Sequence, residues 1–239
     1  MTETVKLAYA GVRVQPGAQA TRRKPYIGLA MEGSIARRYA RETGGDLARF
    51  RAIVDEIAGR VAPGSSILEV APGPGYLAVE LARSNTVTGL DISRTFVEIA
   101  AANAAAASVE ADFRVGDAAA MPLPSDSFDL VVCCAAFKNF REPVEALCEM
   151  HRVLKPGGLA LIHDMRRDAS NSAIEEEVRS LKLSRTGRLM TRWIFKYSLR
   201  PRAYALDAFR TLVAATPFGT CTIDEAPLGF AAWLTKPPA

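Results

Sequence analysis

The sequence predicts an α/β fold with a doubly wound, mostly parallel sheet. Short apolar runs alternate with helical patterns from Ile67 onward, which is typical of a parallel sheet covered on both faces. The first apolar run passes directly into a glycine turn and then a helix, the usual opening of a nucleotide-binding fold. The chain has 239 residues, 49% of them hydrophobic and 23% charged, which suits one well-filled core.

Seven strands are expected, of which the first five are parallel. Their predicted ranges are 67–70, 86–90, 112–115, 130–134 and 159–163, and a closing antiparallel hairpin pairs 221–224 with 230–234 around Ala226-Pro227. Helical patterns fill the intervals at 76–83, 95–107 and 143–154; the last begins at a proline and stops before Lys155-Pro156-Gly157-Gly158.

Two further helical segments flank this core. Ser34 to Val61 reads as a helical flap with a break at Gly44-Gly45, and Pro63-Gly64 ends it. Arg166 to Arg202 interrupts the strand–helix alternation and is helical and basic, so it reads as an insertion. We therefore expect a tail and flap at 1–62, a core at 63–165, a helical lid at 166–202, and a C-terminal helix and hairpin at 203–239.

Composition narrows the classes of function. The start of the chain lacks a signal-peptide pattern and no segment is long enough to cross a bilayer, so we expect a cytoplasmic protein. The four cysteines show no C-x-x-C spacing and no His–carboxylate cluster is evident, so we expect buried thiols and no metal site. The net charge of +4 permits an anionic partner without requiring one.

The turn in ILEVAPGPGY separates two classes of ligand. Gly73 to Ala78 fits the dinucleotide pattern G-x-G-x-x-G/A, and Asp91 follows at a suitable distance. However, Pro72 and Pro74 remove two backbone donors that a pyrophosphate needs. An ionised Glu69 would repel a diphosphate and would favour an ammonium or sulfonium group. S-adenosylmethionine carries both cations and no phosphate, so an NAD-dependent oxidoreductase becomes the less favoured alternative.

Acidic residues also end the next two predicted strands. Asp91 ends the second strand, and Gly116-Asp117-Ala118 ends the third. The fourth strand lies in FDLVVCCAAFKNF. A helix then leads to HRVLKPGG and the fifth strand. Together these motifs resemble the class I S-adenosylmethionine-dependent methyltransferases, in particular the type 11 group with the ubiquinone and menaquinone C-methyltransferases. The resemblance covers about 66–164 and implies a Rossmann-like fold.

The resemblance also implies a cofactor site. Gly73 and Gly75 would let the backbone approach the methionine part, while Ala71 stands where the family commonly has its first glycine and narrows the turn. Glu69 would hold the ammonium group, and Asp91 would bind the ribose hydroxyls. The remaining residues of the implied set lie near the adenine or at the end of the fourth strand: Ile92, Asp117, Ala118 and Cys134.

The acceptor side is expected around two segments. AAFKNF resembles a segment of the quinone methyltransferases, which makes Phe137, Lys138 and Asn139 candidates, although Lys138 reads equally well as a solvated loop lysine. Where the acceptor needs a general base, His163, with Asp164 beside it, is the best titratable candidate; a structural histidine is the alternative. We expect methyl transfer to a small acceptor, aromatic or quinone-like, at carbon or oxygen.

Other aromatic and basic residues are open to several interpretations. Tyr26, Met31 and Tyr39 would either close over the cofactor or pack in the core. The helix around Arg188 to Tyr197 is amphipathic and basic. We favour a lid in which Trp193 lines an apolar pocket; a membrane contact, a nucleic-acid methyltransferase surface and a solvated face are the alternatives. No nucleic-acid partner is expected.

Overall fold

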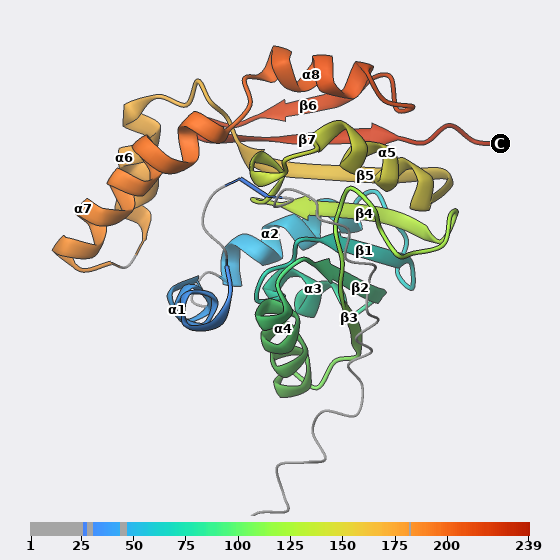
Figure 1. Cartoon of the computed structure of the whole chain (residues 1–239), viewed down its shortest axis with the longest axis horizontal. Helices are drawn as coiled ribbons and strands as arrows, with labels where there is room; N and C mark the ends of the chain where they lie inside the picture. The colour runs from blue at the N-terminus through green and yellow to red at the C-terminus, as the bar shows by residue number, and fades with distance from the viewer. Residues whose placement is uncertain (1–25, 28–30, 44–46, 182) are drawn as a thin grey trace, which may run out of the picture.

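The computed structural model describes residues 26–27, 31–43, 47–181 and 183–239 and contains the predicted seven-stranded sheet (Figure 1). The strand order is β3-β2-β1-β4-β5-β7-β6, in which the first five strands are parallel and β7 runs antiparallel to both neighbours. The Rossmann-like fold class is therefore confirmed. The strand bounds are β1 Ser66–Val70, β2 Thr86–Asp91, β3 Ala111–Val115, β4 Phe128–Cys134, β5 Leu154–Met165, β6 Thr222–Glu225 and β7 Gly229–Thr235.

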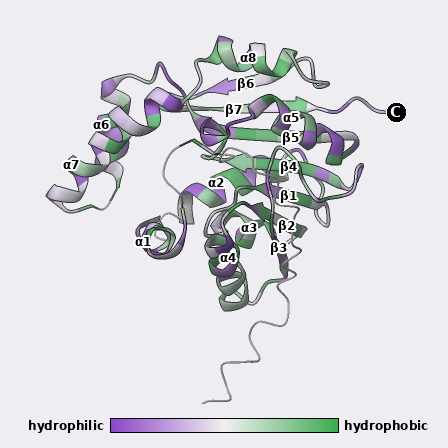
Figure 2. Cartoon of the chain, in the orientation of Figure 1, coloured by the Kyte–Doolittle hydropathy of each residue, from purple (hydrophilic) through white to green (hydrophobic). Residues whose placement is uncertain are grey.

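Helices cover both faces of the sheet because successive strand residues point to opposite sides. Leu68 and Val70 pack with α5 (Pro143–Val153) and α8 (Leu206–Ala214), whereas Ile67 packs with α3 (Tyr76–Leu81) and α4 (Arg94–Ala106). The strands β1, β4 and β5 are accordingly apolar along most of their length (Figure 2). Both faces of the central strands are buried.

The flap consists of two helices, α1 (Gly33–Thr43) and α2 (Leu47–Ala58), and the expected break at Gly44-Gly45 lies outside the described residues. The hydroxyl of Tyr76 donates a 2.6 Å hydrogen bond to the carbonyl of Ala40, which ties α1 to the start of α3. The indole of Trp233 donates to Glu56 of α2 at 2.9 Å. The flap is thus fastened to the core at both of its helices.

The start of the flap is anchored to the N-terminus of α4. The Glu32 carboxylate accepts hydrogen bonds from the backbone N–H groups of Arg94 and Thr95 at 3.0 and 3.2 Å. Ser93 donates to the carbonyl of Met31 at 2.6 Å and also caps α4 by accepting from Phe96. This places the segment before α1 beside the carboxyl end of β2.

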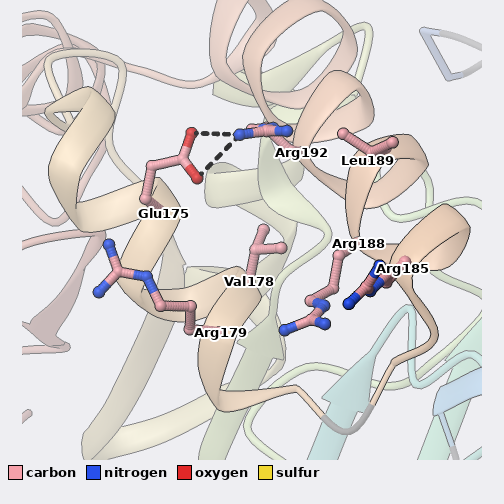
Figure 3. A pocket seen from close by; sticks show the side chains of 7 residues that line it. All are labelled: Glu175, Val178, Arg179, Arg185, Arg188, Leu189 and Arg192. Carbon is pink, nitrogen blue, oxygen red and sulfur yellow. Dashed lines mark hydrogen bonds and ion pairs between the residues drawn. The ribbon is translucent and has the colours of Figure 1, made fainter.

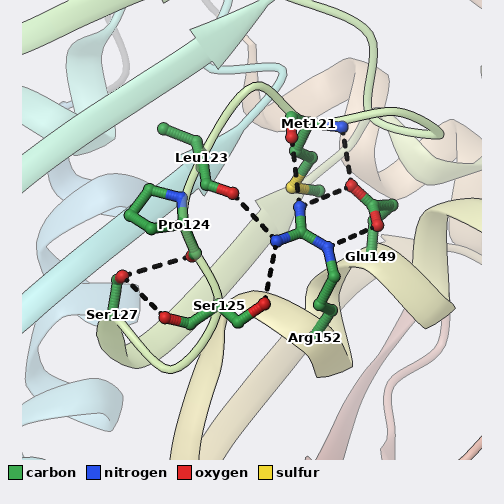
Figure 4. Close-up of polar contacts among 7 residues, drawn as sticks. All are labelled: Met121, Leu123, Pro124, Ser125, Ser127, Glu149 and Arg152. Atoms are coloured by element: carbon green, nitrogen blue, oxygen red, sulfur yellow. Dashed lines mark hydrogen bonds and ion pairs between the residues drawn. The ribbon is translucent and has the colours of Figure 1, made fainter.

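The loop before β4 is fixed by one arginine of α5. The Arg152 guanidinium donates to the carbonyls of Met121 and Leu123 and forms an ion pair with Glu149, which in turn accepts from the Met121 N–H (Figure 4). These hydrogen bonds pair backbone groups of the loop between β3 and β4, which have no partner among the described strands. This network lies near the amino end of β4, and it shapes the scaffold rather than the site.

Two helices and a short irregular helical segment follow β5. They are α6 (Asn171–Ser180), α7 (Arg185–Ile194), a π-helical turn Phe195–Leu199 and a 3-10 turn Arg200–Arg202. The pair α6–α7 projects beyond the end of the sheet where β4 and β5 finish (Figure 1). None of the helices in the described ranges is long and apolar enough to span a membrane.

Candidate functional site

The glycine turn after β1 has a left-handed backbone at three positions. Ala71, Gly73 and Gly75 have φ values of 56°, 55° and 77°. A methyl group on Gly75 would lie 2.7 Å from the Cβ atom of Ala100 in α4, so this position requires glycine. At Gly73 no heavy atom of the described residues, apart from its chain neighbours, lies within 4 Å of that position, so the described part of the chain leaves the front of the turn open to a ligand.

Asp91 closes the turn from the neighbouring strand. Its Oδ2 atom accepts from the Gly73 N–H at 2.9 Å and its Oδ1 atom accepts from the Ser93 N–H at 2.8 Å. Burial raises the pKa of Asp91 to about 6, and these backbone hydrogen bonds oppose that rise. The backbone N–H of Ile92 also lowers the pKa of Asp91, and a carboxylate has about four acceptor positions, so at least one remains for a ligand such as a ribose hydroxyl.

Glu69 is a buried carboxyl group with an unsatisfied oxygen. Burial raises its pKa to about 8, partly opposed by the backbone N–H of Ala78 in the first turn of α3 and increased by the charge of Asp91. Its Oε2 atom is buried and has no hydrogen-bond partner among the described residues. A buried acceptor of this kind is costly unless a donor or a cation reaches it.

The residues expected at the adenine lie along the ends of β2 and β3. Ile92 follows Asp91 directly and is 43% exposed, an unusual position for an isoleucine beside a buried strand end. Asp117 accepts from the Ala119 N–H at 3.0 Å and thereby shapes the loop, and Ala118 is half-buried against the core. An apolar surface beside a loop carboxylate suits a flat base with an amino group.

Cys134 and His163 occupy neighbouring strands and point to the same side of the sheet as Glu69. Cys134 and His163 are paired in the β4–β5 register, and the β5 strand continues two residues past His163 to Met165. Burial raises the pKa of Cys134 to about 11, so it is a neutral thiol. Burial and the charge of Arg49 lower the pKa of His163, and its Nδ1 atom is buried with no partner in the described part of the chain.

Two residues expected at the acceptor are instead buried on the other side. Phe137 is fully buried and packs against Phe140, Tyr204 and Phe209 with ring centroids 5.4–5.7 Å apart. Lys138 is only 5% exposed; its ammonium group forms a 2.7 Å ion pair with Asp164 and donates to the carbonyl of Ala135. These partners explain why neither side chain faces the acceptor. Phe137 is buried among aromatic rings, and the Lys138 ammonium group is paired with Asp164 inside the protein.

Asn139 is half-buried and contacts the end of the inserted segment, whereas Trp193 lies on the exposed surface of α7. The Oδ1 atom of Asn139 accepts from Arg202 at 2.9 Å, and its carbonyl accepts from the Ile27 N–H at 2.7 Å. Asn139 thus joins the loop after β4 to Ile27, which precedes the flap, and to the end of the inserted segment. Trp193 is 61% exposed on α7 and contacts Tyr197, rather than lining a closed apolar pocket.

Three contributions could not be read from the sequence. Glu32 fixes the flap to α4, Arg49 places positive charge near His163, and Arg202 links the insertion to Asn139. Each of these three interactions joins residues that are far apart in the sequence, so no local spacing of residues predicts it. For Tyr26, Met31 and Tyr39 the sequence allowed either closure over the cofactor or packing, and Tyr39 packs edge-on against Phe96 of α4, with ring centroids 5.8 Å apart.

These groups fit S-adenosylmethionine in three respects. The unsatisfied Glu69 oxygen would pair with its ammonium group, Asp91 has acceptor capacity for the ribose, and the front of Gly73 is open to the methionine part. The turn offers few donors to a diphosphate, because residues 72 and 74 are prolines. Within the described residues, no group of three His, Cys, Asp or Glu side chains could hold a metal ion.

Comparison with known proteins agrees with this geometry. Residues 68–162 match the family model described as a methyltransferase domain. Demethylmenaquinone methyltransferase of Deinococcus radiodurans is 36% identical over 107 residues, 44% of each chain. The enzyme of the same name from Thermus thermophilus is 38% identical over 122 residues, 50% of this chain and 54% of the relative. The chain thus aligns with about half the length of these curated relatives.

Solved structures confirm the fold over nearly the whole chain. A crystal structure assigned to the S-adenosylmethionine-dependent methyltransferases, from Methanococcus maripaludis, has a TM-score of 0.70 at 19% identity and covers 93% of this chain and 99% of that one. A methyltransferase of the same class from Aquifex aeolicus has a TM-score of 0.59 at 13% identity, covering 80% and 98%. The resemblance expected from the motifs is confirmed for the core, and the fold for the chain.

Proposed function

Because residues 68–162 carry a methyltransferase domain, we propose that the protein transfers a methyl group from S-adenosylmethionine to a small aromatic or quinone-like acceptor, at carbon or oxygen. The observation that carries the proposal is Glu69, a buried carboxyl group with a pKa of about 8 and one oxygen without a partner. An ammonium or sulfonium group beside this carboxyl favours its ionised form and pairs with it, whereas a diphosphate would raise its pKa further and form no ion pair with it. The NAD-dependent alternative is correspondingly disfavoured.

The proposed class of methyl acceptor is supported by the names of the curated relatives. Both curated relatives described above are named demethylmenaquinone methyltransferases, and a third from Synechococcus elongatus is named 2-phytyl-1,4-naphtoquinone methyltransferase at 34% identity over 114 residues. Those names describe aromatic, quinone-type acceptors. A likeness over about half of each relative supports the class of acceptor for this chain, with carbon or oxygen as the methylated atom.

The chain's own residues would contribute alignment, exclusion of water and proton removal. Bound S-adenosylmethionine supplies an electrophilic methyl group on its sulfonium, which an acceptor attacks in line with the leaving sulfur. The flap, fastened by Tyr76 and Glu32, would cover the carboxyl ends of β1 and β2 and limit water access. Cys134, neutral and half-buried, would provide an uncharged wall beside the reacting groups.

His163 is our proposed general base for an acceptor that must lose a proton. Its lowered pKa keeps the imidazole neutral at pH 7, and a neutral imidazole has a lone pair available to accept a proton. The buried Nδ1 atom has no partner among the described residues, and it lies on the Glu69 side of the sheet. The nearby charge of Arg49 would favour the anionic form of a phenol or enol.

The test is methyl transfer from labelled S-adenosylmethionine to a panel of naphthoquinols, benzoquinols and simple phenols, with RNA as a comparison substrate. Incorporation into a quinol or phenol supports the proposal; incorporation into RNA alone would contradict it. His163→Ala should lower turnover by on the order of 10²–10⁴-fold while leaving S-adenosylhomocysteine affinity unchanged. The matched control is His151→Ala, the other histidine of the chain, which packs against Phe218.

A further inference from the structure

Helix α7 turns its apolar side chains toward solvent. Leu189, Met190 and Trp193 of α7 are 58%, 56% and 61% exposed, Tyr197 of the adjoining π-helical turn is 66% exposed, and α7 has no buried residue. At 100° per residue these four side chains fall within one broad face of the helix. An amphipathic helix normally covers its apolar face with the core, so the exposed apolar face of α7 needs another explanation.

Positive charge surrounds this apolar face. The sequence has no acidic residue between Glu177 and Asp207, an interval with eight basic residues: Arg179, Lys182, Arg185, Arg188, Arg192, Lys196, Arg200 and Arg202. Arg192 and Lys196 are neutralised in part by Glu175 of α6, with N–O distances of 3.2 and 3.3 Å. Set against the three glutamates of α6, Glu175 to Glu177, the eight basic residues leave residues 171–202 with a net charge of +5.

Three of these arginines border a cavity between α6 and α7. The cavity has a volume of about 360 Å³ and is lined by Arg179, Arg185 and Arg188 together with the Glu175–Arg192 pair (Figure 3). Among the described residues, none of the three has an ion-pair partner. It is separate from Glu69 and Asp91, since no residue of the glycine turn lines it. Its chemistry suits a phosphate group rather than the cofactor.

We propose that α7 docks on the surface of an anionic phospholipid bilayer. Leu189, Met190 and Trp193 would enter the boundary between head groups and acyl chains, while Arg185 and Arg188 bind lipid phosphates. Basic side chains beside tryptophan and leucine on one amphipathic helix are the pattern of an interfacial helix. Charge complementarity with anionic lipids supplies the long-range attraction, and the apolar side chains supply the insertion.

The composition of this face favours a bilayer over the two other occupants. An RNA-binding surface would stack bases on aromatic rings, but Leu189 and Met190 provide half of the exposed apolar face. A lid closing over the cofactor would bury apolar side chains but would also bring Arg185 and Arg188 toward a cationic ligand, which is unfavourable. Neither conflict arises at an anionic membrane surface.

Docking on a bilayer extends the proposed function, and its biological role rests on that function. The segment follows β5, whose carboxyl end carries His163, so a membrane under α7 would lie near the acceptor side of the sheet. An apolar quinone-like acceptor partitions into the bilayer, and docking would let the enzyme take it up there. Vesicle binding can be measured without cofactor or acceptor, so its failure is distinct from failure of the methyl transfer.

Tryptophan fluorescence of the full chain tests the proposal directly. The chain has two tryptophans, and Trp233 is only 4% exposed and hydrogen-bonded to Glu56, so Trp193 is the solvent-exposed reporter. Vesicles of phosphatidylcholine with about one third phosphatidylglycerol should shift the emission to shorter wavelength and allow quenching by brominated acyl chains. Trp193→Phe should abolish both signals while retaining most of the vesicle binding in a sedimentation assay.

Charge variants provide the matched comparison. Arg185→Gln with Arg188→Gln should weaken binding to the anionic vesicles by about 25-fold, since each arginine near the surface contributes about 1 kcal/mol, a factor of about five. Arg83→Gln with Arg210→Gln makes the same change in net charge at exposed positions of other elements and should have little effect. S-adenosylhomocysteine affinity should be unchanged in both double variants, which shows that they fold.

Several results would overturn the proposal. These are equal binding to pure phosphatidylcholine, no vesicle binding at low salt, or binding without any change at Trp193. Retention on RNA in the absence of vesicle binding would assign the basic surface to nucleic acid instead. A Trp193 emission shift produced by S-adenosylhomocysteine alone, with no response to vesicles, would identify α7 as a lid.

Discussion

The Oδ2 atom of Asp91 accepts a hydrogen bond from the backbone N–H of Gly73 at 2.9 Å, so the acid that ends β2 holds the glycine turn that ends β1. The other oxygen holds the start of α4 through the Ser93 N–H. One carboxylate therefore fixes two of the backbone segments that surround the proposed cofactor site. Its role in binding is inseparable from its role in shaping the turn.

Asp91→Asn should weaken S-adenosylhomocysteine binding by about 10- to 100-fold. The amide keeps the size of the side chain, but only one of its two terminal atoms accepts hydrogen bonds, so the Gly73 or the Ser93 N–H loses its partner. Calorimetric titration measures the change. Asp112→Asn, which removes a carboxylate from an exposed ion pair with Arg114, is the control and should leave affinity unaltered. Equal affinity in Asp91→Asn would remove Asp91 from the site.

Glu69→Gln should stabilise the free protein while impairing cofactor binding. The folded-state pKa of about 8 lies above the unfolded value near 4.5, so the wild-type protein loses stability as pH rises through this interval. The variant lacks this loss, and its free energy of unfolding should exceed that of wild type by on the order of 4 kcal/mol at pH 8. At pH 4 the difference should be small, because the carboxyl group is protonated in both states. Denaturant titrations at the two pH values measure it.

The same group should couple cofactor binding to proton release. Below pH 8 the free Glu69 is mostly protonated, and pairing with an ammonium group favours its ionised form, so affinity should rise with pH up to about 8. Calorimetry at pH 7 in buffers of different ionisation enthalpy should report release of close to one proton. Glu69→Gln should abolish that release. Proton release unchanged in the variant would show that another group titrates.

Lys138→Met should destabilise the fold by about 3–5 kcal/mol, because it leaves the Asp164 carboxylate buried without its cation. The double variant Lys138→Met with Asp164→Asn should recover part of this loss, since no buried charge is left unpaired. Urea denaturation measures both. If Lys138 instead acts on the acceptor, the single variant will unfold at nearly the wild-type urea concentration but lose turnover.

Ala71→Gly should raise the free energy of unfolding by about 0.5–1 kcal/mol. Ala71 has a φ of 56°, a conformation that costs free energy for a residue with a Cβ atom and not for glycine. Ala101→Gly, in the middle of α4, is the opposite control and should lower stability by about 1 kcal/mol. A destabilised Ala71→Gly variant would show that the alanine methyl contributes packing that outweighs the backbone strain.

The fold could be predicted from the sequence because its signals are local. Apolar runs bounded by turn residues predicted all seven strands, and the helices predicted to begin at 95 and at Pro143 begin at Arg94 and Pro143. The predicted start of the fifth strand was late by five residues. Lys155-Pro156-Gly157-Gly158 looks like a turn, yet Leu154 pairs with Phe128 and the strand passes through an irregularity there.

The site residues at the ends of parallel strands could be predicted from the sequence. Those whose side-chain direction depends on distant burial partners could not. Glu69 and Asp91 end parallel strands, so their proximity follows from topology. Lys138 and Phe137 lie next to Asn139 in the sequence, but Asp164 and an aromatic cluster draw the first two inward. Apart from Phe140, those partners are more than twenty residues away in the sequence. A solvated lysine and an ion-paired one cannot be distinguished from AAFKNF alone.

Side-by-side calorimetric titration with S-adenosylmethionine, S-adenosylhomocysteine and NADH tests the central claim most directly. Glu69, with its raised pKa and unsatisfied oxygen, predicts micromolar binding of the first two ligands and none of NADH. Glu69→Gln should weaken S-adenosylmethionine and S-adenosylhomocysteine alike, since both carry the ammonium group. Binding of NADH alone would contradict the account, because a diphosphate would then occupy a turn that has two prolines and a buried acid.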